Sequence, residues 1–263
     1  FKQKTAYEIG VRLVGSEMCI RDSNWARVAA QTVYYFTTAS KLVSPNERIS
    51  FCVPTGNFGN IFAGYIAAQM GLPVHRLVIA SNHNDILTRA HASGIMEIQE
   101  VEPSTSPAMD IQVSSNFERL LFDLSGKDAS WLRDAMQEFR SNGSLTLEPP
   151  VLERLRNFFD AGTATEQEVA KTIAQVHSTQ QQFLDPHTAV GVNVARQIDL
   201  GNAPVAIMAT AHPAKFEAVV KEATGVAPPQ PEEITALGDK PERCADLPND
   251  LTSVMEFVLG VSE

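Results

Sequence analysis

Apolar residues in the first part of the chain alternate between helical and strand-like spacing. Over residues 25–42 they recur three and four positions apart, which predicts a helix. Short continuous apolar runs at 49–53 and 76–80 predict strands, and the apolar stretch between them, 61–70, predicts a helix. Two strands joined by one helix form a βαβ unit, so we expect these strands to be parallel, with a right-handed crossover.

The pattern beyond residue 80 is richer in helices than in strands. A helix over 85–93 is expected to end at Gly94, and residues 95–101 are expected to form a third strand. An apolar run at 204–208 predicts a further strand. Other helices are predicted over 116–124, 129–139, 150–159, 165–181, 185–198, from 213 onward and over 252–259. This order of elements predicts an α/β protein with a doubly wound, mostly parallel sheet and a helical insertion at about residues 110–182.

Composition is that of an ordinary globular protein, with 44% hydrophobic and 20% charged residues. No run of about 18 apolar residues is present, so no membrane-spanning helix is predicted. A net charge of −10 without clustered Lys and Arg argues against nucleic acid as a partner. Cys52 and Cys244 lie far apart without metal-ligand spacing, which favours a reducing cytoplasm, and Cys52 is expected to be a core residue.

The loop after the first predicted strand has the composition of an anion site. Pro54 ends the strand, and Gly56 and Gly59 follow before the helix at 61–70. Glycine adopts backbone angles that other residues avoid, so we expect several N–H groups to converge on an anion here. The N-terminus of the helix adds further N–H groups and partial positive charge. On spacing alone, a phosphate-binding loop and an ordinary tight turn both remain open.

The sequence of this loop resembles that of a known enzyme family. Residues 54–60, Pro-Thr-Gly-Asn-Phe-Gly-Asn, resemble the cofactor-phosphate loop of threonine synthases, pyridoxal 5'-phosphate (PLP) enzymes of the fold-type II class, which includes tryptophan synthase β. Other segments that match in the family's order are Asn24-Trp25-Ala26-Arg27, Asn82-His83-Asn84-Asp85, Ser115-Asn116-Phe117, Asp185-Pro186-His187-Thr188 and Ala209-Thr210-Ala211-His212-Pro213. The resemblance covers residues 24 to about 224, is to the fungal and enterobacterial branch of the family, and implies the fold-type II fold.

The resemblance also implies which residues form the site. The backbone amides of Gly56, Asn57, Phe58 and Gly59 would bind the cofactor phosphate, with Asn60 close by, and the Thr210 hydroxyl would lie on the pyridine nitrogen. The candidates for binding substrate phosphate are Asn24, Arg27, Ser115 and Asn116. Two alternatives remain open: Arg27 as a solvated or ion-paired side chain on a helix surface, and Ser115 with Asn116 as the cap of the helix that follows.

The implied activity is the conversion of O-phosphohomoserine, a small-molecule substrate, and water into threonine and phosphate. Family members hold PLP as a Schiff base on a lysine within an Ala/Ser-Phe-Lys-Asp segment, and no lysine here has that context. We therefore assign no catalytic residue in this chain and expect no significant turnover from it alone. Alternatives are a threonine-synthase-like lyase that releases phosphate without making threonine, and a non-catalytic phosphate- or PLP-binding module.

Two further expectations concern the histidines, as possible metal ligands, and the division of the chain into segments. His83, His91, His187 and His212 are scattered without ligand spacing, so no metal site is predicted. Residues 7–23 have no counterpart in the family and resemble a translated sequencing adapter that occurs in assembled environmental DNA. We expect 1–23 to be a non-native leader, 24–226 a PLP-binding α/β portion and 227–263 a proline-rich loop and helix. The chain would then be the C-terminal fragment of an enzyme, incomplete at its N-terminus and of open oligomeric state.

Overall fold

The computed structural model describes residues 24–236, 241 and 244–261. They belong to two compact units, divided between Pro228 and Pro229. The adapter-like residues 7–23 lie outside the described residues.

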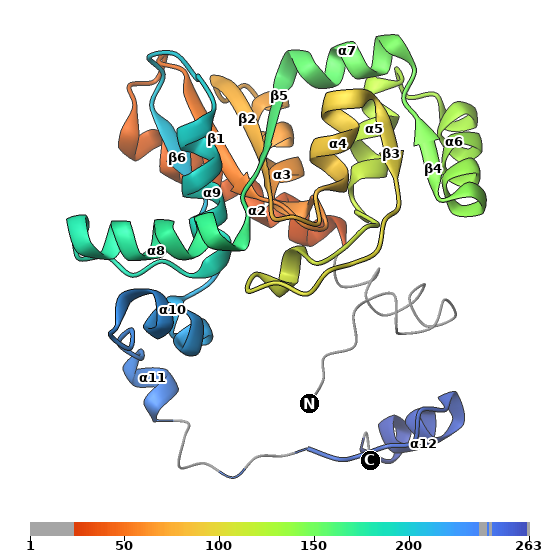
Figure 1. The fold of residues 1–263 in the computed structure, drawn as a ribbon. Helices are drawn as coiled ribbons and strands as arrows, with labels where there is room; N and C mark the ends of the chain where they lie inside the picture. The colour runs from red at the N-terminus through yellow and green to blue at the C-terminus, as the bar shows by residue number, and fades with distance from the viewer. Residues whose placement is uncertain (1–23, 237–240, 242–243, 262–263) are drawn as a thin grey trace. The chain divides into compact units, whose positions relative to one another are not determined.

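The first unit is built on a sheet of four parallel strands in the order β5-β2-β1-β6 (Figure 1). The strands are β1 (Ile49–Pro54), β2 (Val74–Ser81), β5 (Phe159–Thr163) and β6 (Val205–Ile207). The chain adds β2 and β5 on one side of β1 and then returns to add β6 on the other side. The strand order therefore switches direction between β1 and β6, which is where ligands bind in open α/β sheets, beyond the carboxyl ends of the strands.

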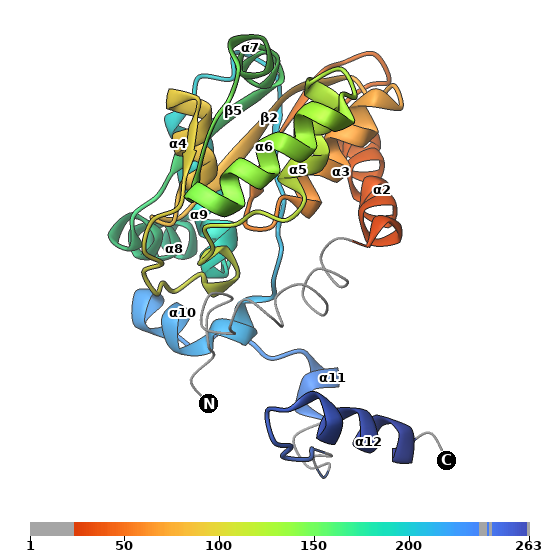
Figure 2. The ribbon, with the colours of Figure 1, turned by 90° about the vertical axis from the view of Figure 1, so that its right-hand side faces the viewer.

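Helices cover both faces of this sheet (Figure 2). The core on one face is shared with α2 (Trp25–Leu42), α3 (Gly59–Gln69), α4 (Ile86–Ser93), α5 (Phe117–Leu124), α6 (Ala129–Asn142) and α7 (Pro149–Phe158), of which α6 packs on α5 and β4 (Ser144–Thr146). The core on the other face is shared with α8 (Glu166–Gln180), α9 (Pro186–Gln197) and α10 (Glu217–Thr224). Two short 3-10 helices, η1 (Pro107–Met109) and η2 (Pro213–Phe216), complete the unit. The expected α/β fold with a doubly wound parallel sheet is confirmed.

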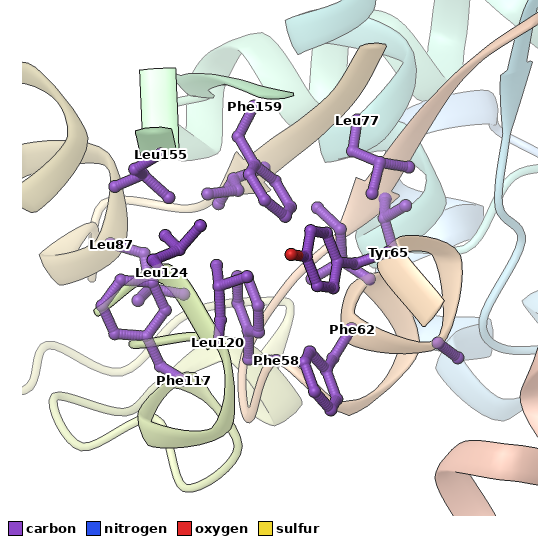
Figure 3. Close-up of a cluster of buried hydrophobic side chains, with 14 of the residues drawn as sticks. Phe58, Phe62, Tyr65, Leu77, Leu87, Phe117, Leu120, Leu124, Leu155 and Phe159 are labelled. Atoms are coloured by element: carbon purple, nitrogen blue, oxygen red, sulfur yellow. The ribbon is translucent and has the colours of Figure 1, made fainter. Parts of the chain in front are cut away.

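Alternation along β1 divides the interior into two cores. Phe51 and Val53 face the first core, and Cys52, between them, faces the second. The first core is rich in aromatic rings, as Figure 3 shows around Phe58 and Phe159. Cys52 is buried, as expected of a core residue, and burial raises the pKa of its thiol to about 12.

Most predicted elements occur within a few residues of their expected bounds, and α2 has the bounds that were predicted. Gly94 ends α4 with a φ of 80°, as its C-cap role requires. The strand predicted at 95–101 is shorter than expected and does not join the main sheet. Only β3 (Ile95–Glu97) forms there, and it pairs antiparallel with β4 (Ser144–Thr146) in a separate two-stranded sheet.

The true third strand of the main sheet is β5, and the sequence pattern missed it. Its sequence, Phe-Asp-Ala-Gly-Thr, has one fully buried residue, Phe159, and was read as the end of a helix and a loop. β5 is an edge strand held partly by polar contacts, since Asp160 accepts two hydrogen bonds from Arg76 on β2, at 2.6 and 2.7 Å. The segment expected as a helical insertion at about 110–182 therefore also supplies β4 and β5.

The second unit contains two helices among its described residues, α11 (Glu232–Thr235) and α12 (Leu251–Val261). α12 matches the helix predicted at 252–259. Of the helices that the structure describes, none combines the length and the apolar character needed to cross a membrane.

Candidate functional site

A cavity of about 680 Å³ opens at the carboxyl ends of β1 and β6, at the switch point of the sheet. This volume lies within the range of small-molecule sites, roughly 300–1,000 Å³. The lining residues are Arg27, Val28, Gln31, Tyr34 and Thr38 of α2, residues 54–61, Ala108, Asn116 and residues 207–210. All six residues predicted to bind the cofactor therefore line one cavity.

The loop that enters this cavity uses its glycines differently from the prediction. Neither Gly56 nor Gly59 has a positive φ; the left-handed residue is Phe58, with a φ of 63°. A bulky residue in this conformation is strained, and Phe58 is held there by burial and by an edge-to-face contact with Phe117. Gly56 is needed for space, because a Cβ there would lie 2.4 Å from the carbonyl oxygen of Ala108.

Hydrogen bonds from segment 114–116 fix the direction of the loop's peptide groups. The Ser114 hydroxyl donates to the carbonyl of Gly56 at 2.9 Å. The backbone N–H and side-chain amide of Asn116 both donate to the carbonyl of Asn57, at 3.1 and 2.9 Å. In a trans peptide the C=O and N–H point in opposite directions, so the N–H groups of Asn57 and Phe58 point away from this segment.

The start of α3 adds donors at the same place. α3 begins at Gly59, and the first N–H groups of a helix have no acceptor within the helix. Asn60 is anchored by Tyr35, whose hydroxyl lies 2.9 Å from both the carbonyl and the side-chain oxygen of Asn60. Burial raises the pKa of the Tyr35 phenol well above its usual value, so this hydroxyl stays protonated and remains a donor. The loop and helix start together form an arrangement suited to binding a phosphate group.

Thr210 also lines this cavity. The N–H of Met208 donates to the carbonyl of Cys52 at 2.9 Å, which extends the pairing of β6 with β1 up to the strand end. Two residues later Thr210 is exposed and lines the cavity. Its hydroxyl is thus available to a ligand whose phosphate lies on the loop after β1.

The four substrate candidates separate into two groups. Arg27 and Asn116 line the cavity, whereas Asn24 and Ser115 do not. Arg27 is exposed and forms no ion pair with another described residue. Asn24 is the N-cap of α2 and accepts from the N–H of Ala26 at 2.9 Å. The ligand roles of these residues stay predictions.

Asn116 does not support the capping alternative. It stands at the N-cap position of α5, but its side chain makes no capping bond and donates to Asn57 instead. Its clearest role in the structure is to hold the loop after β1.

Comparisons with known proteins point to one family. The family model "Threonine synthase, C-terminal" matches residues 188–258. Threonine synthase of Pseudomonas aeruginosa is 44% identical over 251 residues, which cover 95% of this chain and 53% of that relative. The structure of PLP-bound threonine synthase from Brucella melitensis matches with a TM-score of 0.87 and 50% identity, covering 89% of this chain and 51% of that one. This chain belongs to the threonine synthase family.

Other members are more distant. The yeast threonine synthase structure matches with a TM-score of 0.73 and 35% identity, over 81% of this chain and 47% of that one. The human protein named threonine synthase-like 2 is 37% identical over 86% of this chain and 48% of its own length. The chain spans about half the length of the curated relatives it matches.

The sequence reasoning missed one wall of this threonine synthase cavity. Gln31, Tyr34 and Thr38 line it together with Arg27. Their spacing of four, three and four residues places them on one face of α2, and a polar face of a helix beside the loop was the available signal. Ala108 was missed as well, because its contact with Gly56 joins segments far apart in the sequence.

The described residues provide neither a lysine in the cavity nor a set of metal ligands. No lysine lines the cavity among the described residues. In the same residues, no three His, Cys, Asp or Glu side chains are grouped as a metal site.

Proposed function

We propose that this chain supplies the phosphate-binding and ring-contacting side of a PLP-dependent threonine synthase, which converts O-phosphohomoserine and water into threonine and phosphate. The observation that carries the proposal is the loop after β1, whose carbonyls are held by Ser114 and Asn116 while its N–H groups point the other way. Thr210 lies in the same cavity. The family membership and the PLP-bound relative support this interpretation.

The residues present fit PLP. The backbone N–H groups of residues 56–59, with Asn60 beside them, would hold the cofactor phosphate at the start of α3. The Thr210 hydroxyl would contact the ring nitrogen, and a neutral hydroxyl does not force that nitrogen to stay protonated as a carboxylate would. When bound, PLP supplies an electron sink for loss of the substrate's α-proton.

We place the substrate phosphate on the α2 wall of the cavity. Arg27 is the one cationic residue among the described lining residues, and guanidinium groups bind phosphate through paired hydrogen bonds. Gln31, Tyr34 and Thr38 follow it along the same helix face and add neutral donors. The partner is thus a small anionic molecule. We place the protein in the reducing cytoplasm because its described cysteines, Cys52 and Cys244, are free thiols.

The experiment is a chimera. Residues 24–263 are joined to the N-terminal half of the Pseudomonas aeruginosa threonine synthase, and both phosphate and threonine are measured from O-phosphohomoserine. We expect both products in equal amounts, and a strong loss of both in Arg27→Gln. Phosphate without threonine identifies the lyase alternative. A folded, PLP-loaded chimera that releases neither overturns the proposal.

Borohydride trapping of the 263-residue chain with PLP tests the absence of a catalytic lysine. We expect weak, scattered labelling and no phosphate release, because no described lysine lines the cavity. One stoichiometrically labelled lysine would contradict this.

A further inference from the structure

The Asp185-Pro186-His187-Thr188 segment has no role in the site described so far. It is nevertheless linked to the loop after β1, because Ala108 contacts both His187 and Gly56. Asp185 is the N-cap of α9 and is buried, with 1% of its surface exposed. Its carboxylate accepts from the N–H groups of His187 and Thr188 and from the Thr188 hydroxyl. The carboxylate is therefore held rigidly at the start of the helix.

The hydrogen bonds of His187 define its tautomer. One ring nitrogen, Nε2, lies 3.3 Å from the N–H of Ala108. A backbone N–H only donates, so Nε2 must be an unprotonated acceptor. The other nitrogen, Nδ1, then carries the proton and donates to Asp185 at 3.0 Å. Asp185 thus orients the ring so that its acceptor faces Ala108.

Ala108 connects this pair to the phosphate loop. It lies in η1 and lines the cavity. Its N–H is held by His187, and its carbonyl lies so close to Gly56 that only a residue without a Cβ fits there. The same peptide segment therefore joins the start of α9 to the first glycine of the loop.

We propose that His187 is a positioning residue for the phosphate loop: it holds Ala108 against Gly56 and so adds a third anchor to those that Ser114 and Asn116 provide. This inference rests on the proposed function for the identity of the ligand. The hydrogen bond between His187 and Ala108 does not depend on it.

The test uses four variants of the full chain. His187→Gln keeps an acceptor at the distance of Nε2, His187→Asn keeps a donor to Asp185 but does not reach Ala108, and His187→Phe keeps only the ring. His177→Phe is the matched control, because the His177 ring also lies against a phenylalanine, Phe183, as His187 lies against Phe216. Affinity is measured for PLP and for pyridoxal, which lacks the phosphate.

We expect PLP binding to weaken roughly five- to tenfold in His187→Asn and His187→Phe, the scale of one lost hydrogen bond. His187→Gln and His177→Phe should stay within about twofold of wild type, and pyridoxal binding should not change. Loss of PLP binding in His187→Gln and His187→Asn, with His187→Phe unchanged, would show that ring packing on Phe216 is what matters, and would overturn the proposal.

Hydrogen exchange gives a readout that needs no cofactor. Amides of residues 104–110 and 55–60 should exchange faster in His187→Asn and His187→Phe than in wild type and His187→Gln. Unchanged exchange in these segments would overturn the proposal. If wild type binds no PLP, the cofactor assignment fails while the exchange pattern still decides the role of His187.

Discussion

The carboxyl ends of the neighbouring strands β1 and β2 are both polar, but their polar groups serve different purposes. After β2, Asn82, Asn84, Ser104 and Asp110 bond to one another: the Asp110 carboxylate accepts from both asparagine side chains and from the hydroxyl and N–H of Ser104. After β1, the loop has its carbonyls held from outside while its N–H groups point the other way. One end is a closed network and the other is open to a ligand.

The difference shows that a polar motif at a strand end is not by itself a site. Both Asn82-His83-Asn84-Asp85 and the loop at 54–60 match family motifs. Only the second lines the cavity. What separates them is whether the partners of the polar groups lie within the chain, and this depends on segments distant in sequence. Substitutions at the two ends should therefore affect different measurements.

The largest effect on stability is expected at the closed end. Asp110→Ala removes a buried carboxylate that accepts from the side chains of Asn82 and Asn84 and from the N–H of Ser104, which should lower the free energy of unfolding by about 3–5 kcal/mol. Asp128→Ala is the matched control: Asp128 is exposed and caps α6, so its loss should cost about 1 kcal/mol. Urea unfolding measures both. Equal losses would mean that the network does not hold this strand end.

At the open end, Gly56→Ala should affect both stability and binding. The added Cβ would meet the Ala108 carbonyl at 2.4 Å and force the segments apart, at a cost of about 1–3 kcal/mol. PLP binding should fall more than tenfold, because the loop moves. Gly201→Ala, with a φ of 64° and no atom within 4 Å, should lose stability through backbone strain alone and bind PLP as wild type does. Unchanged PLP binding in Gly56→Ala would contradict the role of this contact.

These two ends also show how far the sequence alone leads. The residues of the open end were identified, because an apolar strand, a glycine loop and a helix follow one another locally. The way the loop is held was not, since Ser114, Ala108 and Gly56 meet only in three dimensions. Phe58 took the left-handed angle expected of a glycine because tertiary packing on Phe117 compensates for the strain.

The sheet shows a similar limit. β1 is buried throughout and β2 is buried from Leu77 onward, and the apolar runs in these parts revealed both strands. β5 lies at an edge and carries Asp160 and Gly162, so an apolar run could not mark it. Its position depends on pairing with β2 and on the bonds from Arg76, neither of which has a local signal.

A smaller effect on stability is expected from Tyr35→Phe, which tests whether the bond from Tyr35 to Asn60 supports the loop at the open end. The change removes the donor to Asn60 in a buried position and should cost about 1 kcal/mol of unfolding free energy. PLP binding should weaken a few-fold because Asn60 loses its anchor. Tyr34→Phe is the neighbouring control, since Tyr34 is exposed and its stability contribution should be negligible. If the two variants unfold alike, the Tyr35 hydroxyl does not support the loop.

The smallest effect on stability is expected at Thr210. A substitution there is therefore the sharpest test of whether the strand end after β1 is open to a ligand. Thr210 is exposed at the cavity wall, so Thr210→Val should change the free energy of unfolding by less than about 0.5 kcal/mol. PLP binding should nevertheless weaken several-fold, and Thr210→Ser should restore it, because only the hydroxyl is needed. Binding of inorganic phosphate, which meets the loop alone, should be the same in all three proteins. A hydroxyl that affects binding and not stability belongs to an open strand end; if Thr210→Val binds PLP as wild type does, the ring contact assigned to Thr210 is wrong.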